Sequence, residues 1–352
     1  MDWSIYKQKY TSMALDQGIE TKTIEENLSY AEVLYHKQLP IIYDEVHLGQ
    51  LTGISHDYMF KVSNDSKKFY KTFRIKKRTG GYRKISEPLP NLKIIQNWIL
   101  NEILYKIETH PSAKAYRKDI SLRENVKFHR NQEIVLKLDI QSFFNNIREK
   151  YVYRIFKELG YKKNIANLLT KLCTLSGSLP QGAVTSPYLS NLILRKFDKK
   201  IYTYCRRKAI RYTRYADDLS FSGKFNKHHL ISRVENELSK LKLKLNTKKI
   251  RILRSHQQQI ITGIVVNEKI QVSKKYRKLI RQEVYYINKY GLDNHLSVKY
   301  NLEGIDDLKK NAYLKSLIGK AEYVLFINKN DKEMPEYIML LRNLLVELKS
   351  ET

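Results

Sequence analysis

Apolar side chains recur along this chain with two different periods, and these predict strands and helices in a mixed order. β-branched and aromatic residues that alternate with polar ones, or form short unbroken runs, predict strands. Such segments lie at 69–88, 134–138, 212–221 and 260–269. Apolar residues spaced by three or four positions predict helices. These segments lie at 24–35, 92–107, 186–200 and 230–241. The mixture indicates an α+β protein.

From residue 273 onward the pattern is helical throughout. Ser273 can cap a helix, and Pro335 suits the first turn of a later one. Apolar residues at helical spacing form a stripe between them: Leu314, Leu317, Ile318, Ala321 and Leu325. The lysines on the other faces either bind a polyanion or are simply solvated. A boundary near residue 270 separates this part from the rest.

The balance of charges narrows the class of partner. The 352 residues include 65 Lys and Arg against 36 Asp and Glu, a formal net charge of +29, together with 26 Tyr. Such an excess indicates a polyanion, first of all nucleic acid, on whose bases tyrosine rings can stack. An A/T-rich genome would also enrich Lys and Tyr, but it does not account for so few acids.

Two further features bear on where the protein works. The two cysteines, Cys173 and Cys205, lack metal-ligand spacing and predict reduced thiols. Residues 1–10 carry no apolar signal core. No segment approaches the roughly 20 apolar residues that a membrane span needs. We therefore expect a cytoplasmic protein without a membrane partner.

Two adjacent acids, Asp217 and Asp218, interrupt the strand pattern at 212–221. Asp favours turns, so the segment predicts a hairpin with both carboxylates at its tip. Two like charges at a tight turn repel each other. A divalent cation would convert that repulsion into binding, because hard cations take carboxylate oxygens. A solvated turn without a ligand is the plain alternative.

A third acid, Asp139, ends the apolar run at 134–138. A lone carboxylate at the end of a buried strand requires a partner. It could cap the following helix, or it could join Asp217 and Asp218 if the strands are neighbours in one sheet. Three such acids could hold two divalent ions for phosphoryl transfer. Magnesium fits best, because every ligand is an oxygen.

Two more segments suggest contacts with phosphates. Residues 69–88 predict a hairpin around Gly80 and Gly81, with a tip crowded by Lys and Arg. That tip could close over a triphosphate or grip a nucleic-acid backbone non-specifically. Residues 179–187 predict a loop leading into a helix, where Gly182 permits close approach of the backbone.

The order of these segments resembles that of reverse transcriptases over residues 70–270. The motifs are the basic hairpin, Asp139 with Phe143-Phe144, Leu179-Pro180-Gln181-Gly182, Tyr215-Ala216-Asp217-Asp218, and Asn246 with Lys249. Within that class the chain is most similar to bacterial retron reverse transcriptases. Asn125-Val126-Lys127-Phe128-His129 resembles their Asn-Ala-x-x-His motif, and Ile261-Thr262-Gly263 resembles their Val-Thr-Gly motif. Each differs from the family pattern at one residue.

The resemblance implies roles for the matching residues. Asp139, Asp217, Asp218 and the Ile140 carbonyl would bind two Mg²⁺ ions. The nucleotide-binding residues would be Lys76, Lys77, Arg83, Ile140, Phe144, Gln181, Gly182 and Lys249. Among these, Phe144 would exclude a 2′-hydroxyl and Lys249 would lie near the departing pyrophosphate. RNA contacts would come from Asn125, His129, Lys274, Lys275, Arg277, Lys278 and Arg281.

The fold that the resemblance implies is a right-hand polymerase with a ferredoxin-like palm, fingers and a helical thumb. We expect an N-terminal helical extension at 1–60, fingers at 61–138 with 150–180, a palm at 139–269 and an RNA-binding thumb at 270–352.

The implied partners are a structured noncoding RNA as template and primer, dNTPs, a single-stranded DNA product and an effector protein in antiphage defence. Two other functions stay open on sequence alone. One is a different defence reverse transcriptase, with untemplated or protein-primed synthesis. The other is a non-catalytic RNA-binding protein, against which the intact Asp139, Asp217 and Asp218 argue.

Overall fold

The computed structural model describes residues 2–77, 80–118, 120–302 and 304–350. Its central feature is a four-stranded antiparallel sheet in the order β4-β5-β3-β6. The strands are β3 (Ile134–Asp139), β4 (Arg211–Tyr215), β5 (Asp218–Gly223) and β6 (Arg251–Arg254). Helices connect β3 to β4 and β5 to β6, which gives the β-α-β-β-α-β arrangement of ferredoxin-like folds. The ferredoxin-like sheet expected for a palm is confirmed, and it begins at Ile134, before residue 139 where the palm was expected to start.

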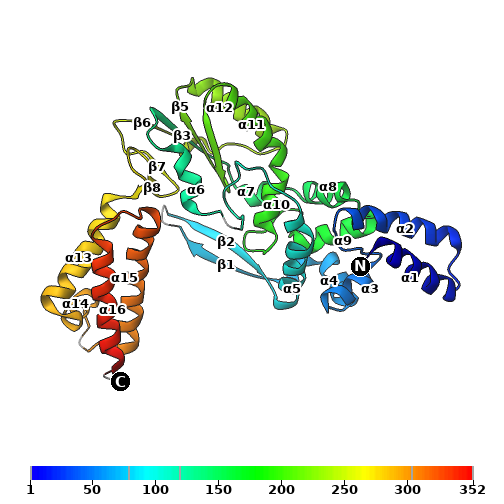
Figure 1. Cartoon of the computed structure of the whole chain (residues 1–352), viewed down its shortest axis with the longest axis horizontal. Coiled ribbons are helices and arrows are strands. Elements are labelled where there is room, and N and C mark those ends of the chain that lie inside the picture. Colours follow the sequence, from blue (N-terminus) through cyan, green and yellow to red (C-terminus); the bar gives the residue numbers. More distant parts are fainter. Residues whose placement is uncertain (1, 78–79, 119, 303, 351–352) are drawn as a thin grey trace.

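The two faces of this sheet pack into different cores because side chains alternate along a strand. Leu136 and Leu138 belong to a core shared with α11 (Arg195–Arg207) and α12 (Lys227–Ser239). Val135 points to the opposite face and belongs to a second core, which also contains residues of the C-terminal helices. One strand therefore joins the two main cores of the molecule. Figure 1 shows α11 and α12 covering the first face.

Four helices precede the first strand, and they lie at the end of the molecule farthest from the C-terminal helices (Figure 1). They are α1 (Trp3–Asp16), α2 (Thr21–His36), α3 (Glu45–Thr52) and α4 (His56–Asn64). The apolar spacing predicted for α2 is confirmed, since Ile24, Leu28, Ala31 and Leu34 are buried. A short helix, η1 (Ser66–Phe69), then leads into the hairpin.

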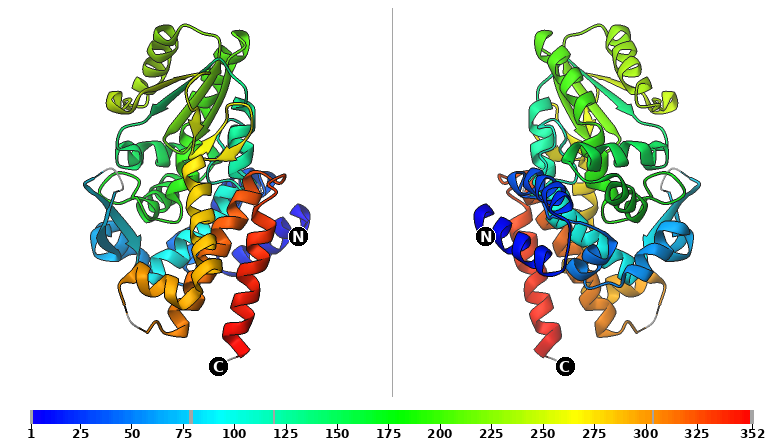
Figure 2. Two further views of the ribbon diagram at one scale, coloured as in Figure 1. Left: turned by 90° about the vertical axis from the view of Figure 1, so that its left-hand side faces the viewer. Right: turned by 90° about the vertical axis from the view of Figure 1, so that its right-hand side faces the viewer.

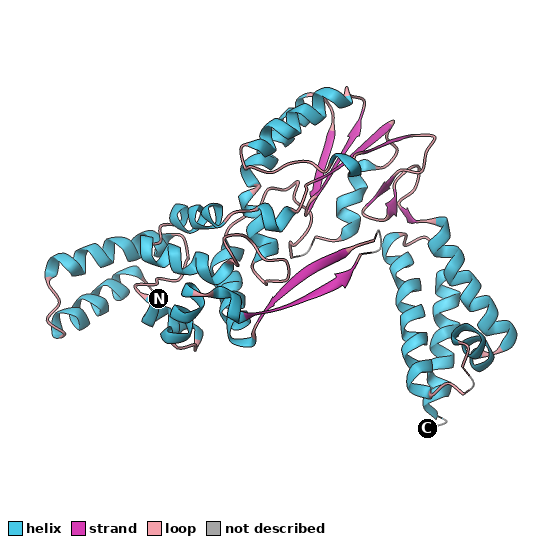
Figure 3. Ribbon diagram, turned by 180° about the vertical axis from the view of Figure 1, so that it is seen from behind, coloured by secondary structure: helices cyan, strands magenta, loops and turns pink. Residues whose placement is uncertain are grey.

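The predicted basic hairpin is present as β1 (Tyr70–Lys76) and β2 (Tyr82–Pro88), paired from Tyr70–Pro88 to Lys76–Tyr82. In Figure 3 it crosses the space between the helical parts at the two ends of the molecule. Between this hairpin and β4 the chain also forms α5 (Pro90–Trp98), α6 (Leu122–Val126), α7 (Phe143–Asn146), α8 (Glu149–Leu159), α9 (Lys163–Cys173) and α10 (Ser186–Ile193). Short turns η2 (Ile99–Ile103), η3 (Leu104–Lys106) and η4 (Lys127–His129) extend α5 and α6. Cys173 and Cys205 are buried free thiols.

A three-stranded sheet leads from the palm to the C-terminal helices. It consists of β7 (Ile260–Ile261), β8 (Ile264–Val265) and β9 (Gln271–Val272), after the turn η5 (Thr247–Lys249) and β6. The helices are α13 (Lys274–Tyr290), α14 (Leu292–Tyr300), α15 (Asp307–Ile327) and α16 (Met334–Ser350). Ser273 caps α13, as predicted, by accepting from the backbone N–H of Tyr276. Figure 2 shows these helices extending downward from the palm. None of the described helices is long and apolar enough to cross a membrane.

Candidate active site

Three acids that are distant in the sequence meet at one end of the palm sheet. Asp139 ends β3 and lies opposite Asp218, the first residue of β5, in the antiparallel register. Asp217 occupies the turn between β4 and β5, and its carbonyl accepts from the backbone N–H of Ile140 at 3.0 Å. The predicted convergence of the three acids is therefore present. The alternative of a helix cap is absent for Asp139, because α7 is preceded by Ser142 and has no side-chain cap.

Two of the acids, Asp217 and Asp218, have a raised pKa. Burial raises the pKa of Asp217 to about 6, and the carboxylates of Asp218 and Asp139 add to that rise. Burial also raises the pKa of Asp218, against the attraction of Lys137. Both shifts show that negative charge is crowded here in a site partly withdrawn from water. A cation at this point would relieve the crowding.

The chain supplies one such cation itself. Lys249 Nζ donates to Oδ2 of Asp139 at 2.7 Å, and this bond is the main reason that the pKa of Lys249 is raised. The backbone N–H of Asn246 donates to the carbonyl of Asp139 at 2.8 Å, which holds this segment against β3. The sequence motif that pairs Asn246 with Lys249 thus lies beside the acids.

The donor set suits a hard divalent ion. Asp139, Asp217 and Asp218 offer carboxylate oxygens, and Ile140 offers a backbone carbonyl next to them. Within residues 2–77, 80–118, 120–302 and 304–350, no three His, Cys, Asp or Glu side chains surround a common point closely enough to qualify as a formed metal site. The fit therefore rests on the chemistry of the oxygens and on the crowded charge.

The basic hairpin exposes its cations. Lys76, Lys77 and Arg83 are all exposed, and the backbone N–H of Lys77 bonds the carbonyl of Gly81 across the turn. The charges of Arg83 and Asp217 both act on the hydroxyl of Tyr116, with opposite signs. Residues Arg78 and Thr79 lie outside the described part.

The loop at 179–182 is joined directly to this hairpin. The carbonyl of Gln181 accepts from the backbone N–H of Ser86 on β2 at 2.8 Å. Gly182 has φ +121°, and a Cβ there would lie 2.8 Å from the carbonyl oxygen of Ser86. The close approach predicted for Gly182 is confirmed, and it is an approach of the loop to β2.

Phe144 lies half-buried at the start of α7. Its ring centroid is 5.2 Å from that of Phe143 and 6.4 Å from that of Tyr116. No sequence pattern predicted that Tyr116 would lie at the site, because it belongs to a segment without regular secondary structure. Burial raises its pKa to about 12, with Asp217 and Tyr215 contributing. Its backbone has φ +60°, which no local pattern revealed.

The structure does not place the side chains of Asn125 and His129 where they could contact RNA. Both side chains are fully buried. His129 contacts Ser222 and Thr213 through its two ring nitrogens, each at 2.8 Å. Asn125 Nδ2 donates to the hydroxyl of Thr262 at 3.4 Å. The two motifs that suggested a retron enzyme therefore contact each other inside the protein, and they support the fold.

The basic residues at the start of α13 divide into two groups. Lys274, Lys275 and Lys278 are exposed. Arg277 bonds Asp331 and Glu333, and Arg281 bonds Glu333 through both carboxylate oxygens. The arginines join α13 to the segment before α16, so the lysines are the freer of these cations for a phosphate backbone.

The family model and the curated relatives agree with these observations. The model of the reverse transcriptase (RNA-dependent DNA polymerase) family matches residues 75–290. The chain is 31% identical over 254 residues to the Retron Ec86 reverse transcriptase of Escherichia coli, covering 71% of this chain and 79% of that protein. It is 29% identical over 240 residues to the Retron Mx162 reverse transcriptase of Myxococcus xanthus, covering 60% and 50%. Among solved structures, telomerase from Candida albicans in complex with a TWJ fragment of telomeric RNA matches with a TM-score of 0.46 and 9% identity, covering 86% of this chain and 67% of that one.

Proposed function

Because this chain belongs to the reverse transcriptase family, and within it to the bacterial retron type, we propose that it copies a structured noncoding RNA into single-stranded DNA. The observation that carries the proposal is the meeting of Asp139 with Asp217 and Asp218 at one end of the palm sheet. Clustered carboxylates, partly withdrawn from water in a strongly basic protein, suit a reaction in which nucleic-acid phosphates and divalent ions come together.

The acids would hold two Mg²⁺ ions, with the Ile140 carbonyl as a further ligand. When bound, such ions activate the attacking hydroxyl and neutralise the leaving pyrophosphate. Burial and crowded charge raise the pKa of Asp217 and of Asp218, so a bound cation would favour the ionised form of both carboxyls. Lys249, already at Asp139, can turn from that carboxylate to the departing phosphates, since it is exposed and flexible.

The remaining contacts would hold the incoming dNTP. Lys76, Lys77 and Arg83 on the hairpin are exposed cations suited to the triphosphate. Gln181 and Gly182 would support the template–nucleotide pair, because their loop is bonded to the same hairpin. Phe144 would lie under the sugar, where a half-buried ring leaves no room for a 2′-hydroxyl.

The RNA would lie along the helical thumb. Lys274, Lys275 and Lys278 present charge to a phosphate backbone, and A-form RNA is read largely through its shape and phosphates. By its similarity to retron enzymes, we propose that the DNA product remains linked to the RNA. We also propose that the protein works with an effector in antiphage defence.

The proposal is tested by expressing the full chain with its neighbouring genomic DNA and sequencing the nucleic acid that copurifies. We expect one structured RNA and a DNA complementary to part of it. Asp217→Asn should abolish Mg²⁺-dependent dNTP incorporation and remove the DNA, while the RNA still copurifies. Incorporation by Asp217→Asn at the wild-type rate would exclude this site. A DNA linked covalently to the protein would point to protein priming instead.

A further inference from the structure

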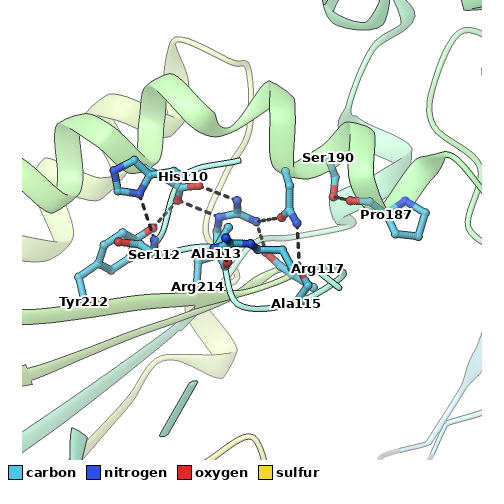
Figure 4. Close-up of polar contacts among 12 residues, drawn as sticks. His110, Ser112, Ala113, Ala115, Arg117, Pro187, Ser190, Tyr212 and Arg214 are labelled. Carbon is cyan, nitrogen blue, oxygen red and sulfur yellow. Dashed lines mark hydrogen bonds and ion pairs between the residues drawn. The ribbon is translucent and has the colours of Figure 1, made fainter. Parts of the chain in front are cut away.

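A fully buried ion pair lies behind the turn that carries two of the acids. The side chains of Arg214, on β4, and Asp198, on α11, are both 0% exposed. The guanidinium donates through Nε and Nη2 to the two carboxylate oxygens of Asp198, at 2.9 and 2.6 Å. Figure 4 shows Arg214 among its contacts. A forked pair of this kind keeps its geometry, because either charge alone would be buried without compensation.

The same guanidinium reaches the turn itself. Arg214 Nη1 donates to the carbonyl of Ala216 at 3.1 Å and to Oδ1 of Asn191 at 3.0 Å. Ala216 has φ +58°, a left-handed conformation that alanine seldom adopts. Asp217 follows directly. A charged donor on the carbonyl of Ala216 holds the backbone in this unfavourable shape.

The backbone of Arg214 holds a second segment in place. Its N–H donates to the carbonyl of Ser112, and its carbonyl accepts from the N–H of Lys114, both at 2.8 Å. Asn191, on α10, donates to the carbonyl of Ala115 at 2.8 Å. Ala115 and Ser112 lie next to Arg214 in Figure 4. Tyr116 follows Ala115 in the chain, and its ring lies beside that of Phe144.

We propose that Arg214, anchored by Asp198, is a positioning residue for the polymerase site. It fixes the left-handed turn at Ala216, so that Asp217 and Asp218 meet Asp139. Together with Asn191 it places the segment that precedes Tyr116. This inference rests on the proposed function. Only arginine satisfies it, because a guanidinium offers five donors in a rigid fork, whereas a lysine ammonium offers three donors at one point.

The first test compares Arg214→Lys with the wild-type full chain. Supporting groups behind metal ligands typically contribute about 10- to 100-fold to metal affinity or activity. We expect kcat for dNTP incorporation to fall by about tenfold or more. The KM for dNTP should change much less, because the hairpin cations are untouched. Binding of Mn²⁺ alone, measured by electron paramagnetic resonance, should weaken about tenfold. Wild-type kcat and Mn²⁺ affinity in a folded Arg214→Lys protein would overturn the proposal.

Two further variants separate positioning from general stability. Asn191→Ala keeps the ion pair between Arg214 and Asp198, but it removes one acceptor of Arg214 and the bond to the carbonyl of Ala115. We therefore expect kcat to fall several-fold. If Arg214→Lys does not fold, this variant tests the positioning role in its place. Tyr212→Phe removes a bond to the same Asp198, 2.7 Å long, but no contact with the turn. It should keep both kcat and Mn²⁺ affinity, and a loss equal to that of the other variants would overturn the proposal.

Measuring both dNTP incorporation and Mn²⁺ affinity distinguishes failure of the proposed polymerase function from failure of the positioning role of Arg214. If the wild-type chain incorporates no dNTP, the polymerase assignment fails. The comparison of Mn²⁺ affinity between the wild-type chain and Arg214→Lys still decides whether Arg214 positions the acids.

Discussion

The ammonium group of Lys249 donates to Oδ2 of Asp139 across 2.7 Å, so a cation from the chain itself neutralises one of the three clustered acids. A metal ion that binds Asp139 must either share its carboxylate with Lys249 or displace the ammonium group from it. The relationship makes Lys249 both a competitor for the acids and a candidate ligand for phosphate, and these two roles predict opposite effects of removing it.

We expect Lys249→Met to bind Mn²⁺ more tightly, by roughly three- to tenfold, because the acids lose a neighbouring positive charge. The same variant should show a higher KM for dNTP, because a phosphate contact is lost. Titration with Mn²⁺ and steady-state kinetics measure the two effects. Lys248→Met, at an exposed neighbouring position, is the matched control. Equal Mn²⁺ affinity in both variants would contradict the competition.

Phe144 is the proposed barrier to ribonucleotides. Phe144→Ala should raise incorporation of rNTPs relative to dNTPs by about tenfold or more, because the ring no longer occupies the space of a 2′-hydroxyl. The ratio of kcat/KM for the two nucleotides measures it. Phe144→Tyr keeps the ring and should keep the selectivity. An unchanged ratio in Phe144→Ala would refute the assignment.

Gly182 connects the 179–182 loop to the hairpin by close packing. Gly182→Ala and Gly177→Ala both place a side chain at positive φ, but only the Cβ at 182 meets a backbone oxygen, at 2.8 Å; at 177 nothing lies within 4 Å. Chemical denaturation should show Gly182→Ala less stable than Gly177→Ala by about 1 kcal/mol or more. Only Gly182→Ala should raise the KM for dNTP. Equal stability and equal KM in the two variants would mean that the 179–182 loop shifts to make room for the new Cβ without moving β2.

His129 makes the fold sensitive to acid. Burial, with the charge of Arg211, lowers its pKa to about 3, whereas an unfolded chain takes up the proton near pH 6.5. Between these values the unfolded state binds more protons at this histidine, so the contribution of His129 to stability should decrease as the pH falls through this window. The slope is at most about 1.4 kcal/mol per pH unit.

Urea denaturation between pH 6.5 and pH 4.5 measures that slope. His129→Gln should lower stability at neutral pH and flatten the dependence, because the titrating group is gone. His256→Gln, at an exposed position, should leave the slope as it is in the wild-type chain. A His129→Gln protein with the full wild-type slope would assign the acid sensitivity to other groups.

The strands and the three acids could be predicted because each has a local signal. Asp139 ends an apolar run, and Asp217 with Asp218 interrupts one, so their places at strand ends followed from spacing alone. Their meeting depends on β3 lying between β5 and β6. That pairing between distant segments became an expectation only through the order of motifs.

Other residues gave misleading signals or none. The RNA contacts expected of His129 and Asn125 came from the family resemblance alone. Only their hydrogen bonds to Ser222, Thr213 and Thr262 show that the two side chains are internal. No sequence pattern distinguished Arg214 from the other Lys and Arg residues, which number 65 in all. Its burial depends on Asp198, which belongs to another element and carries no motif of its own.

The two cysteines have a practical consequence for following the enzyme in motion. Burial raises the pKa of Cys173 and of Cys205 to about 12, and a thiol that is both enclosed and protonated reacts slowly with maleimides. Lys84→Cys on the hairpin and Lys278→Cys on α13 would therefore take a donor and an acceptor dye on a chain with little background labelling. Energy transfer between the dyes would then report, one molecule at a time, how hairpin and thumb move relative to each other during copying.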